Sequence, residues 1–167
     1  VVARLRGSVP MTGFLTGEVR RDGRRVGFRG VTLDGRAFAL AGAGSASGVR
    51  VGPYLVATDE RDAIGVPARE PGPGVRLAVL DEVGKMESFS EAFRDAVDRL
   101  LAADVAVLAT VAAHGVGLPK RVRHDPRVTL LRMRRESRAG FVGEILRRLA
   151  EAGIAPGEGS RPRPEAR

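Results

Sequence analysis

The most informative segment of this chain is residues 75–87, which read Val75-Arg76-Leu77-Ala78-Val79-Leu80-Asp81-Glu82-Val83-Gly84-Lys85-Met86-Glu87. Residues 77–80 contain no polar side chain, which is typical of a strand covered on both faces in a parallel sheet. Asp81 and Glu82 then lie at the carboxyl end of that strand, where open α/β sheets bind their ligands. Because adjacent carboxylates lose hydration and repel each other, we expect a cation or a polar substrate beside them.

An apolar strand that ends in two acids is the Walker B arrangement of nucleotide hydrolases. In those enzymes the first acid holds Mg²⁺, usually through water, and the second polarises the attacking water. The alternative is an acidic loop that caps the next helix. The pattern is common enough that it does not decide between the two by itself.

The residues around the two acids narrow the interpretation. Residues 81–87, followed by Phe89, Ser90 and Phe93, resemble the Asp-Glu-Ile-Gly-Lys-Met-Glu-Leu-Phe-Ser signature of the cancer-related, thermophile-type nucleoside-triphosphatases, a branch of the P-loop NTPases. Other segments similar to that family follow in the same order, at residues 13–20, 24–28, 31–35, 51–54 and 136–138. The resemblance extends from about Arg6 to Leu149.

One feature of the family is absent from the 167 residues. The family begins with a strand and a Gly-x-x-x-x-Gly-Lys-Thr phosphate loop, and this motif does not occur here. Gly84-Lys85 does not qualify, because Val79 stands where the first glycine belongs and Met86 follows the lysine. Residues 1–6 resemble the end of the helix that should follow the loop. We therefore expect a P-loop NTPase-like three-layer α/β sandwich with a β-meander insertion near the N-terminus, with the first strand and the phosphate loop missing and a gap between two unpaired strand edges.

Length and composition favour one domain with a sizeable core. We expect a single domain at residues 1–155 and a disordered tail at 156–167, which is rich in Pro, Gly and Arg. The absence of cysteine excludes disulfides and thiolate metal sites and fits a cytoplasmic protein. No apolar run approaches the length that spans a membrane, so no membrane partner is expected.

The net charge of +8 makes nucleic acid a partner to consider. The basic residues are scattered along the chain and are densest between Lys120 and Arg138. No aromatic residue is interleaved with that cluster, which argues against binding single strands. A solvated Arg-rich surface is the preferred interpretation, and nucleotide phosphates account for part of the cluster equally well. Nucleic acid stays open as a partner but is not favoured.

Turn signals predict the secondary structure of the first half of the chain. Residues 13–40 are expected to form the β-meander, because Asp22-Gly23 and Asp34-Gly35 are strong hairpin signals. A mobile Gly-rich loop, a short strand and a broken helical segment are then expected at residues 41–50, 54–56 and 59–69.

The spacing of apolar residues and of capping residues predicts the secondary structure of the second half of the chain. Ser88 and Glu91 have the spacing of a capping box, with Phe89 and Phe93 as core residues of the helix that follows. A buried strand is expected at residues 104–111 and a final strand at 128–131. The last helix is expected after Ser137, with Phe141, Ile145, Leu146 and Leu149 as its buried face and Gly153 at its end.

The family resemblance implies Mg²⁺-dependent hydrolysis of nucleoside triphosphates such as ATP or GTP to diphosphates and phosphate, with broad base specificity. Asp81 would hold the metal, Glu82 would act as general base or position the water, and Arg138 would neutralise charge on the transferred phosphate. The implied nucleotide-binding residues are Lys85, Thr110, Glu18 and Arg20.

Each of these residues also has a structural interpretation. Glu18 and Arg20 would form an ion pair on a hairpin, Lys85 would order its loop, and Thr110 would bond to backbone. Gly17 and Ser137 replace a Glu and an Asn of the family, so the roles of their neighbours rest on fewer matches.

We expect hydrolysis by this chain to be impaired, because a phosphate loop supplies most of the phosphate affinity. The alternative function is a non-catalytic nucleotide- or nucleic-acid-binding protein built on a decayed NTPase scaffold.

Overall fold

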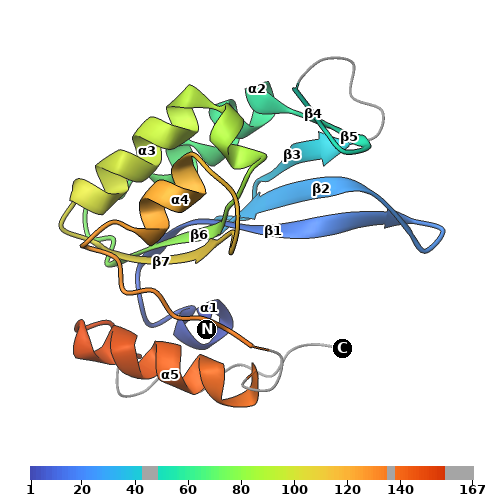
Figure 1. The fold of residues 1–167 in the computed structure, drawn as a ribbon. Helices are drawn as coiled ribbons and strands as arrows, with labels where there is room; N and C mark the ends of the chain where they lie inside the picture. Colours follow the sequence, from blue (N-terminus) through green and yellow to red (C-terminus); the bar gives the residue numbers. More distant parts are fainter. Residues whose placement is uncertain (43–48, 135–137, 157–167) are drawn as a thin grey trace.

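The computed structural model describes residues 1–42, 49–134 and 138–156 (Figure 1). Its elements in chain order are α1 (Val2–Leu5), β1 (Met11–Arg21), β2 (Arg24–Thr32), β3 (Ala37–Gly42), β4 (Val49–Val51), β5 (Tyr54–Val56), α2 (Thr58–Glu60), the π-turn η1 (Arg61–Gly65), the 3₁₀ turn η2 (Pro67–Arg69), β6 (Leu77–Val83), the 3₁₀ turn η3 (Glu87–Phe89), α3 (Glu91–Ala102), β7 (Ala106–Val111), α4 (Leu118–Arg123) and α5 (Arg138–Glu151).

The strands form one mixed sheet in the order β4-β5-β3-β2-β1-β6-β7. β1, β6 and β7 are parallel, whereas β2, β3, β4 and β5 join through antiparallel pairs. The long β1 belongs to both parts, because its first half pairs with β6 and nearly all of it pairs with β2. The predicted meander and the short strand at 54–56 are confirmed.

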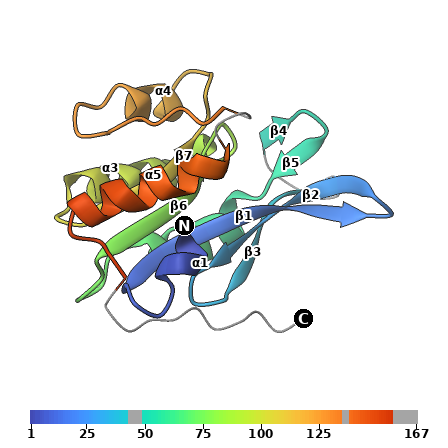
Figure 2. The same ribbon diagram turned by 90° about the horizontal axis from the view of Figure 1, so that it is seen from below.

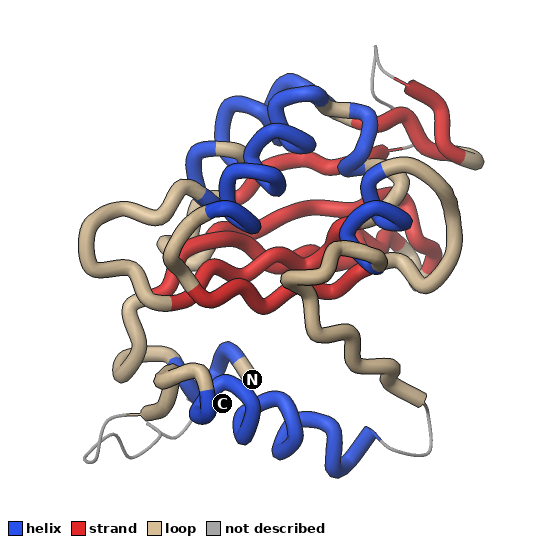
Figure 3. The backbone as a smooth tube through the Cα atoms, turned by 60° about the vertical axis from the view of Figure 1, so that its left-hand side comes forward, coloured by secondary structure: helices blue, strands red, loops and turns tan. Residues whose placement is uncertain are grey.

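Helices cover both faces of the parallel part of the sheet. α3 and α4 lie on one face, and α1 and α5 lie on the other (Figures 1, 2 and 3). β6 alternates between the two cores: Ala78 and Leu80 join the cluster of Phe93 and Leu118, whereas its neighbours pack with the other face in the cluster Leu5, Val9, Leu77, Val79, Leu149 and Ile154. This confirms the predicted three-layer α/β architecture.

Gly13 allows β1 to lie close to β6. Its φ is +117°, and a Cβ at this position would lie 1.9 Å from the carbonyl oxygen of Val79. Only glycine adopts this conformation and leaves this space without strain. The parallel pair that precedes Asp81 therefore depends on the absence of a side chain here.

The start of α3 differs from the predicted capping box. The N-cap is Ser90, whose Oγ accepts a hydrogen bond from the backbone N–H of Phe93 at 2.9 Å, whereas the Ser88 hydroxyl donates to the carbonyl of Gly84. Phe93 is fully buried, but Phe89 is 37% exposed. The prediction for Phe89 was wrong because η3 precedes the helix and turns this residue away from its apolar face.

Two further predictions need correction near β7, and one helix was not predicted there. Residues 128–131 run in an extended path but form no strand, because no neighbouring strand offers them backbone partners among the described residues. β7 is half-buried instead of buried, since one of its edges is open. The short α4 was not predicted; it is held by the buried side chains of Leu118 and Val122.

Two other expectations have mixed outcomes. The broken helical segment is confirmed as α2, η1 and η2, and α5 ends near Gly153 as expected. The predicted mobile loop falls mostly on residues 43–48 and the predicted tail on 157–167, which lie outside the described residues. None of the described helices combines the length and the apolar character needed to cross a membrane.

Candidate active site

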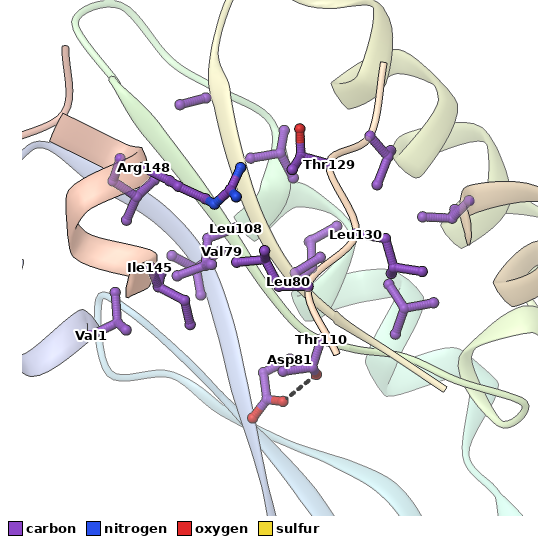
Figure 4. A pocket seen from close by; sticks show the side chains of 18 of the residues that line it. Val1, Val79, Leu80, Asp81, Leu108, Thr110, Thr129, Leu130, Ile145 and Arg148 are labelled. Atoms are coloured by element: carbon purple, nitrogen blue, oxygen red, sulfur yellow. Dashed lines mark hydrogen bonds between the residues drawn. The ribbon is translucent and has the colours of Figure 1, made fainter. Parts of the chain in front are cut away.

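Asp81 is fixed between two neighbouring parallel strands. The register places Leu80 beside Phe14 of β1 and beside Ala109 of β7, so Leu15 and Thr110 flank the next residue of β6. The Thr110 hydroxyl donates to Asp81 Oδ1 at 2.6 Å (Figure 4). The Thr16 backbone N–H donates to Oδ2 at 3.4 Å. The hydroxyl of Thr110 thus bonds to the carboxylate and not to backbone. Asp81 is held by the sheet itself, at its carboxyl edge.

Glu82 follows Asp81 across a cis peptide bond and is more exposed. Partial burial raises the pKa of Glu82, and the neighbouring charge of Asp81 raises it further. Its Oε1 lies 2.5 Å from the position that a Cβ on Gly84 would take. The carboxylate therefore lies over the loop that begins at Gly84.

That loop is anchored by a second carboxylate, Glu87. Its side chain is only 4% exposed, and Oε2 accepts a hydrogen bond from the Gly84 N–H at 3.1 Å. Burial raises the pKa of Glu87, and the charge of Glu82 adds to this effect. The Ser88 hydroxyl donates to the Gly84 carbonyl at 2.6 Å, so both backbone groups of Gly84 are bonded within the loop.

Two arginines are fully buried behind the loop. Arg61 Nη1 donates to the carbonyl of Met86 at 2.9 Å. The guanidinium of Arg69 lies 4.0 Å from the ring centre of Phe93 and 4.9 Å from that of Phe14, and its nitrogens have no hydrogen-bond partner among the described residues. Burial, followed by repulsion from Arg61, lowers the pKa of Arg69 to about 9. The Asp-Glu loop is therefore backed by buried positive charge.

A large groove opens beside these acids. It has a volume of about 1470 Å³ and lies between β7, the extended residues 128–134 and α5. Figure 4 shows Leu108 on one side, Thr129 and Leu130 on the other, and Ile145 and Arg148 reaching in from α5. Apolar side chains line most of its length, and Asp81, Thr110 and His114 lie at its end. The outer edge of β7 forms one wall, because β7 pairs only with β6 among the described strands.

Glu18 and Arg20 lie elsewhere, on the β1–β2 hairpin. Glu18 accepts from Arg20 at 2.7 Å and from Arg25 of β2 at 2.8 Å, and Arg25 also donates to the Tyr54 hydroxyl at 3.1 Å. These bonds lower the pKa of Glu18. The hairpin extends beyond the sheet in Figure 1, and no contact among the described residues joins this pair to Asp81 or Glu82. These contacts are those of the ion pair on a hairpin that was the structural interpretation of Glu18 and Arg20.

The other two predicted residues are not joined to the acids by described contacts. Lys85 is exposed in the loop after β6, and it forms no hydrogen bond or ion pair with the described residues. Arg138 is the first residue of α5; its side chain lies outside the described part of the chain, as do Glu136 and Ser137. The structure thus brings together Asp81, Glu82 and Thr110.

Comparison with known proteins identifies the family. A sequence model of the NTPase family matches residues 1–146. The chain belongs to this family. The chain is 33% identical to the nucleoside-triphosphatase THEP1 of Thermotoga sp. (strain RQ2) over 135 residues, which cover 80% of the chain and 78% of the relative. It is also 33% identical to the cancer-related nucleoside-triphosphatase of Homo sapiens, with 83% and 80% covered.

Solved structures agree with this assignment. The crystal structure of THEP1 from the hyperthermophile Aquifex aeolicus superposes on this chain with a TM-score of 0.75 at 30% identity, covering 89% of the chain and 87% of the relative. The fold is that of a P-loop NTPase, so the fold class predicted from the sequence is confirmed.

The donor groups around Asp81 fit one kind of divalent metal. Among the described residues, no three His, Cys, Asp or Glu side chains lie close enough to hold an ion by themselves. Mg²⁺ does not need such a cluster, because it keeps several waters and binds through one or two carboxylates together with substrate phosphates. Asp81, with Glu82 and the Thr110 hydroxyl beside it, is suited to that type of binding.

Sequence reasoning missed three participants of this neighbourhood. Thr16 lies in a segment that carries the family resemblance, but only the folded structure places its N–H beside the Asp81 carboxylate. Arg61 and Arg69 gave no signal, since an arginine in a polar helical segment is normally exposed. Their burial follows from the packing of η1 and η2 against β1, β3 and the loop after β6.

Proposed function

We propose that this NTPase scaffold hydrolyses nucleoside triphosphates to diphosphates and phosphate with Mg²⁺. The observation that carries the proposal is Asp81 held between Thr16 and Thr110 at the end of the groove, with Glu82 beside it. Phosphoryl transfer depends mainly on positioning of the nucleophile and on neutralisation of phosphate charge. Fixed carboxylates would serve both, one by orienting the water and the other by holding the metal ion that carries the positive charge. The names of the relatives, which are nucleoside-triphosphatases, support the same reaction.

The roles of the two acids follow from their environments. Asp81 is the residue to hold Mg²⁺, which supplies neutralising charge to the phosphates when bound. Its two oxygens already accept hydrogen bonds, so contact through metal-bound water is favoured. Glu82 is free to orient the attacking water and to accept its proton. The raised pKa of Glu82 makes it a better base near neutral pH than an ordinary glutamate.

We further propose that the groove receives a strand that carries the phosphate loop. The outer edge of β7 offers a row of backbone donors and acceptors, and the apolar side chains of residues 128–131 and α5 face it. A strand placed there would end beside Asp81 and Thr110, at the edge where a loop of backbone amides would meet the phosphates. Arg138 is proposed to neutralise phosphate charge from the start of α5.

The 167 residues contain no phosphate loop, so hydrolysis by this chain alone is expected to be slow. The test is single-turnover release of phosphate from radiolabelled ATP, with protein in excess over nucleotide. We expect a slow rate that requires Mg²⁺, falls on the order of 10²-fold but stays measurable in Glu82→Gln, and persists in the control Glu70→Gln, an exposed carboxylate before β6. A rate that does not change in Glu82→Gln would refute the assignment, and a rate equal to that of an intact relative would refute the expected impairment.

A further inference from the structure

Gly84 lies between the two carboxylates of the loop. A Cβ on Gly84 would lie 2.5 Å from Glu82 Oε1 and 2.6 Å from Glu87 Oε2, closer than side-chain atoms approach a Cβ. The φ of Gly84 is not in the left-handed region, so its backbone does not require glycine. What requires glycine is the space that the two carboxylates occupy.

The two carboxylates differ in their freedom to move. Glu87 is buried and bonded to the Gly84 N–H, and the Arg61 guanidinium on the Met86 carbonyl holds the same loop from behind. Glu82 is exposed and accepts no hydrogen bond from the described residues. If a methyl group is added at Gly84, Glu82 is therefore the carboxylate that must turn away.

We propose that Gly84 and Glu87 are positioning residues for the proposed reaction, which together form the seat that directs the carboxylate of Glu82. Glu87 fixes the backbone of the loop through the Gly84 N–H, and Gly84 leaves the space in which Glu82 lies. This inference rests on the role of Glu82 proposed above. Neither residue touches substrate; both act through Glu82.

The main test is Gly84→Ala, compared with Gly72→Ala in the segment before β6. Gly72 also has an ordinary φ, and nothing lies within 4 Å of its added Cβ. In the single-turnover assay, we expect Gly84→Ala to lower the maximal rate on the order of 10²-fold, because small displacements of a reacting group have effects of this size. The nucleotide concentration at half-maximal rate should stay unchanged, and Gly72→Ala should match the wild type in rate and in melting temperature.

A double-mutant comparison separates positioning from general damage. Gly84→Ala should lower the rate no further in a Glu82→Gln background, because it acts through that side chain. An additional loss of the same size in that background would overturn the proposal. Glu87→Ala should reproduce the loss of rate, and Glu87→Gln should restore most of it, because the amide oxygen can still accept from the Gly84 N–H.

A crystal structure of Gly84→Ala provides a readout that does not depend on hydrolysis. We expect the Glu82 carboxylate to be rotated away from the loop and the Glu87–Gly84 hydrogen bond to be kept. If the wild type hydrolyses no nucleotide, the proposed function fails, and this structure still decides whether the seat exists. An unmoved Glu82 carboxylate in the variant would overturn the proposal in either case.

Discussion

At the scale of single residues, the site is defined by which groups bond to Asp81. A carboxylate with a hydroxyl at 2.6 Å on one oxygen and a backbone N–H on the other has few orientations left. The sequence predicted Asp81, Glu82 and Thr110 because they follow apolar runs, and the structure joins the first and the last of them by a hydrogen bond. Glu87 and the buried arginines could not be predicted, since their burial depends on segments that are distant in sequence.

Thr110 is expected to matter through its hydroxyl. In Thr110→Val the shape of the side chain is kept and the donor to Asp81 is lost, so we expect hydrolysis to fall on the order of tenfold, as for the loss of a hydrogen bond to a charged group. Thr110→Ser keeps the hydroxyl and is the control. Phosphate release measures the effect, and equal rates for the valine and serine variants would contradict the role of this bond.

Glu87 should make stability depend on pH. Burial raises its pKa above the ordinary 4.5, so the folded state binds more protons than the unfolded state above that pH. The free energy of unfolding therefore loses part of the Glu87 contribution as pH rises through 4.5 and beyond. Urea unfolding of wild type and Glu87→Gln at several pH values measures this. We expect the stability of the wild type relative to Glu87→Gln to decrease as pH rises. An increase would show that the sign of the effect is wrong.

At the scale of elements, the sequence predicted the strands and turns that are specified by neighbouring residues in the chain. The Asp-Gly turns placed the meander, and the apolar run placed β6. The strand expected at residues 128–131 failed because a strand needs a neighbour, and the groove lies where that neighbour would be. The start of α3 was misplaced because Ser88 and Ser90 both qualify as caps, and only the turn η3 decides between them.

The contact between β1 and β6 should depend on Gly13. Gly13→Ala forces a methyl group against the Val79 carbonyl at a φ that alanine avoids, so we expect a loss of roughly 2–4 kcal/mol in the free energy of unfolding. Gly17→Ala lies on the same strand, in open space and with an ordinary φ, and should change stability little. Urea unfolding compares the two; equal stabilities would contradict the close approach of these strands.

The packing of α3 should depend on Phe93 and not on Phe89. Phe93 is fully buried between the helix and the sheet, so Phe93→Ala is expected to reduce the free energy of unfolding by about 3–5 kcal/mol. Phe89 is 37% exposed and should contribute much less. Thermal and urea unfolding of both alanine variants checks this. A larger loss of unfolding free energy for Phe89→Ala than for Phe93→Ala would show that the start of the helix is assigned wrongly.

At the scale of the whole molecule, the acids and the groove form one arrangement. Three parallel strands bring Asp81 and Thr110 to the sheet edge, and the open side of β7 leads along the groove to the same place. The sequence predicted a gap between two unpaired strand edges. The groove has one such edge, that of β7, and on its other side residues 128–131 form no strand. What the sequence could not predict was the position of the gap at the outer side of β7, because that depends on the order of strands in the sheet.

The most direct test is phosphate release from Mg²⁺-ATP by this chain with and without a synthetic peptide of six apolar residues followed by Gly-x-x-x-x-Gly-Lys-Thr. We predict slow release by the chain alone, and release that the peptide accelerates and that is lost again in Glu82→Gln. A control peptide with Ala in place of the Lys should bind the groove and leave the rate low. Acceleration that persists in Glu82→Gln, or none from a peptide that demonstrably binds the groove, would contradict the claim that groove and acids form one site for nucleotide hydrolysis.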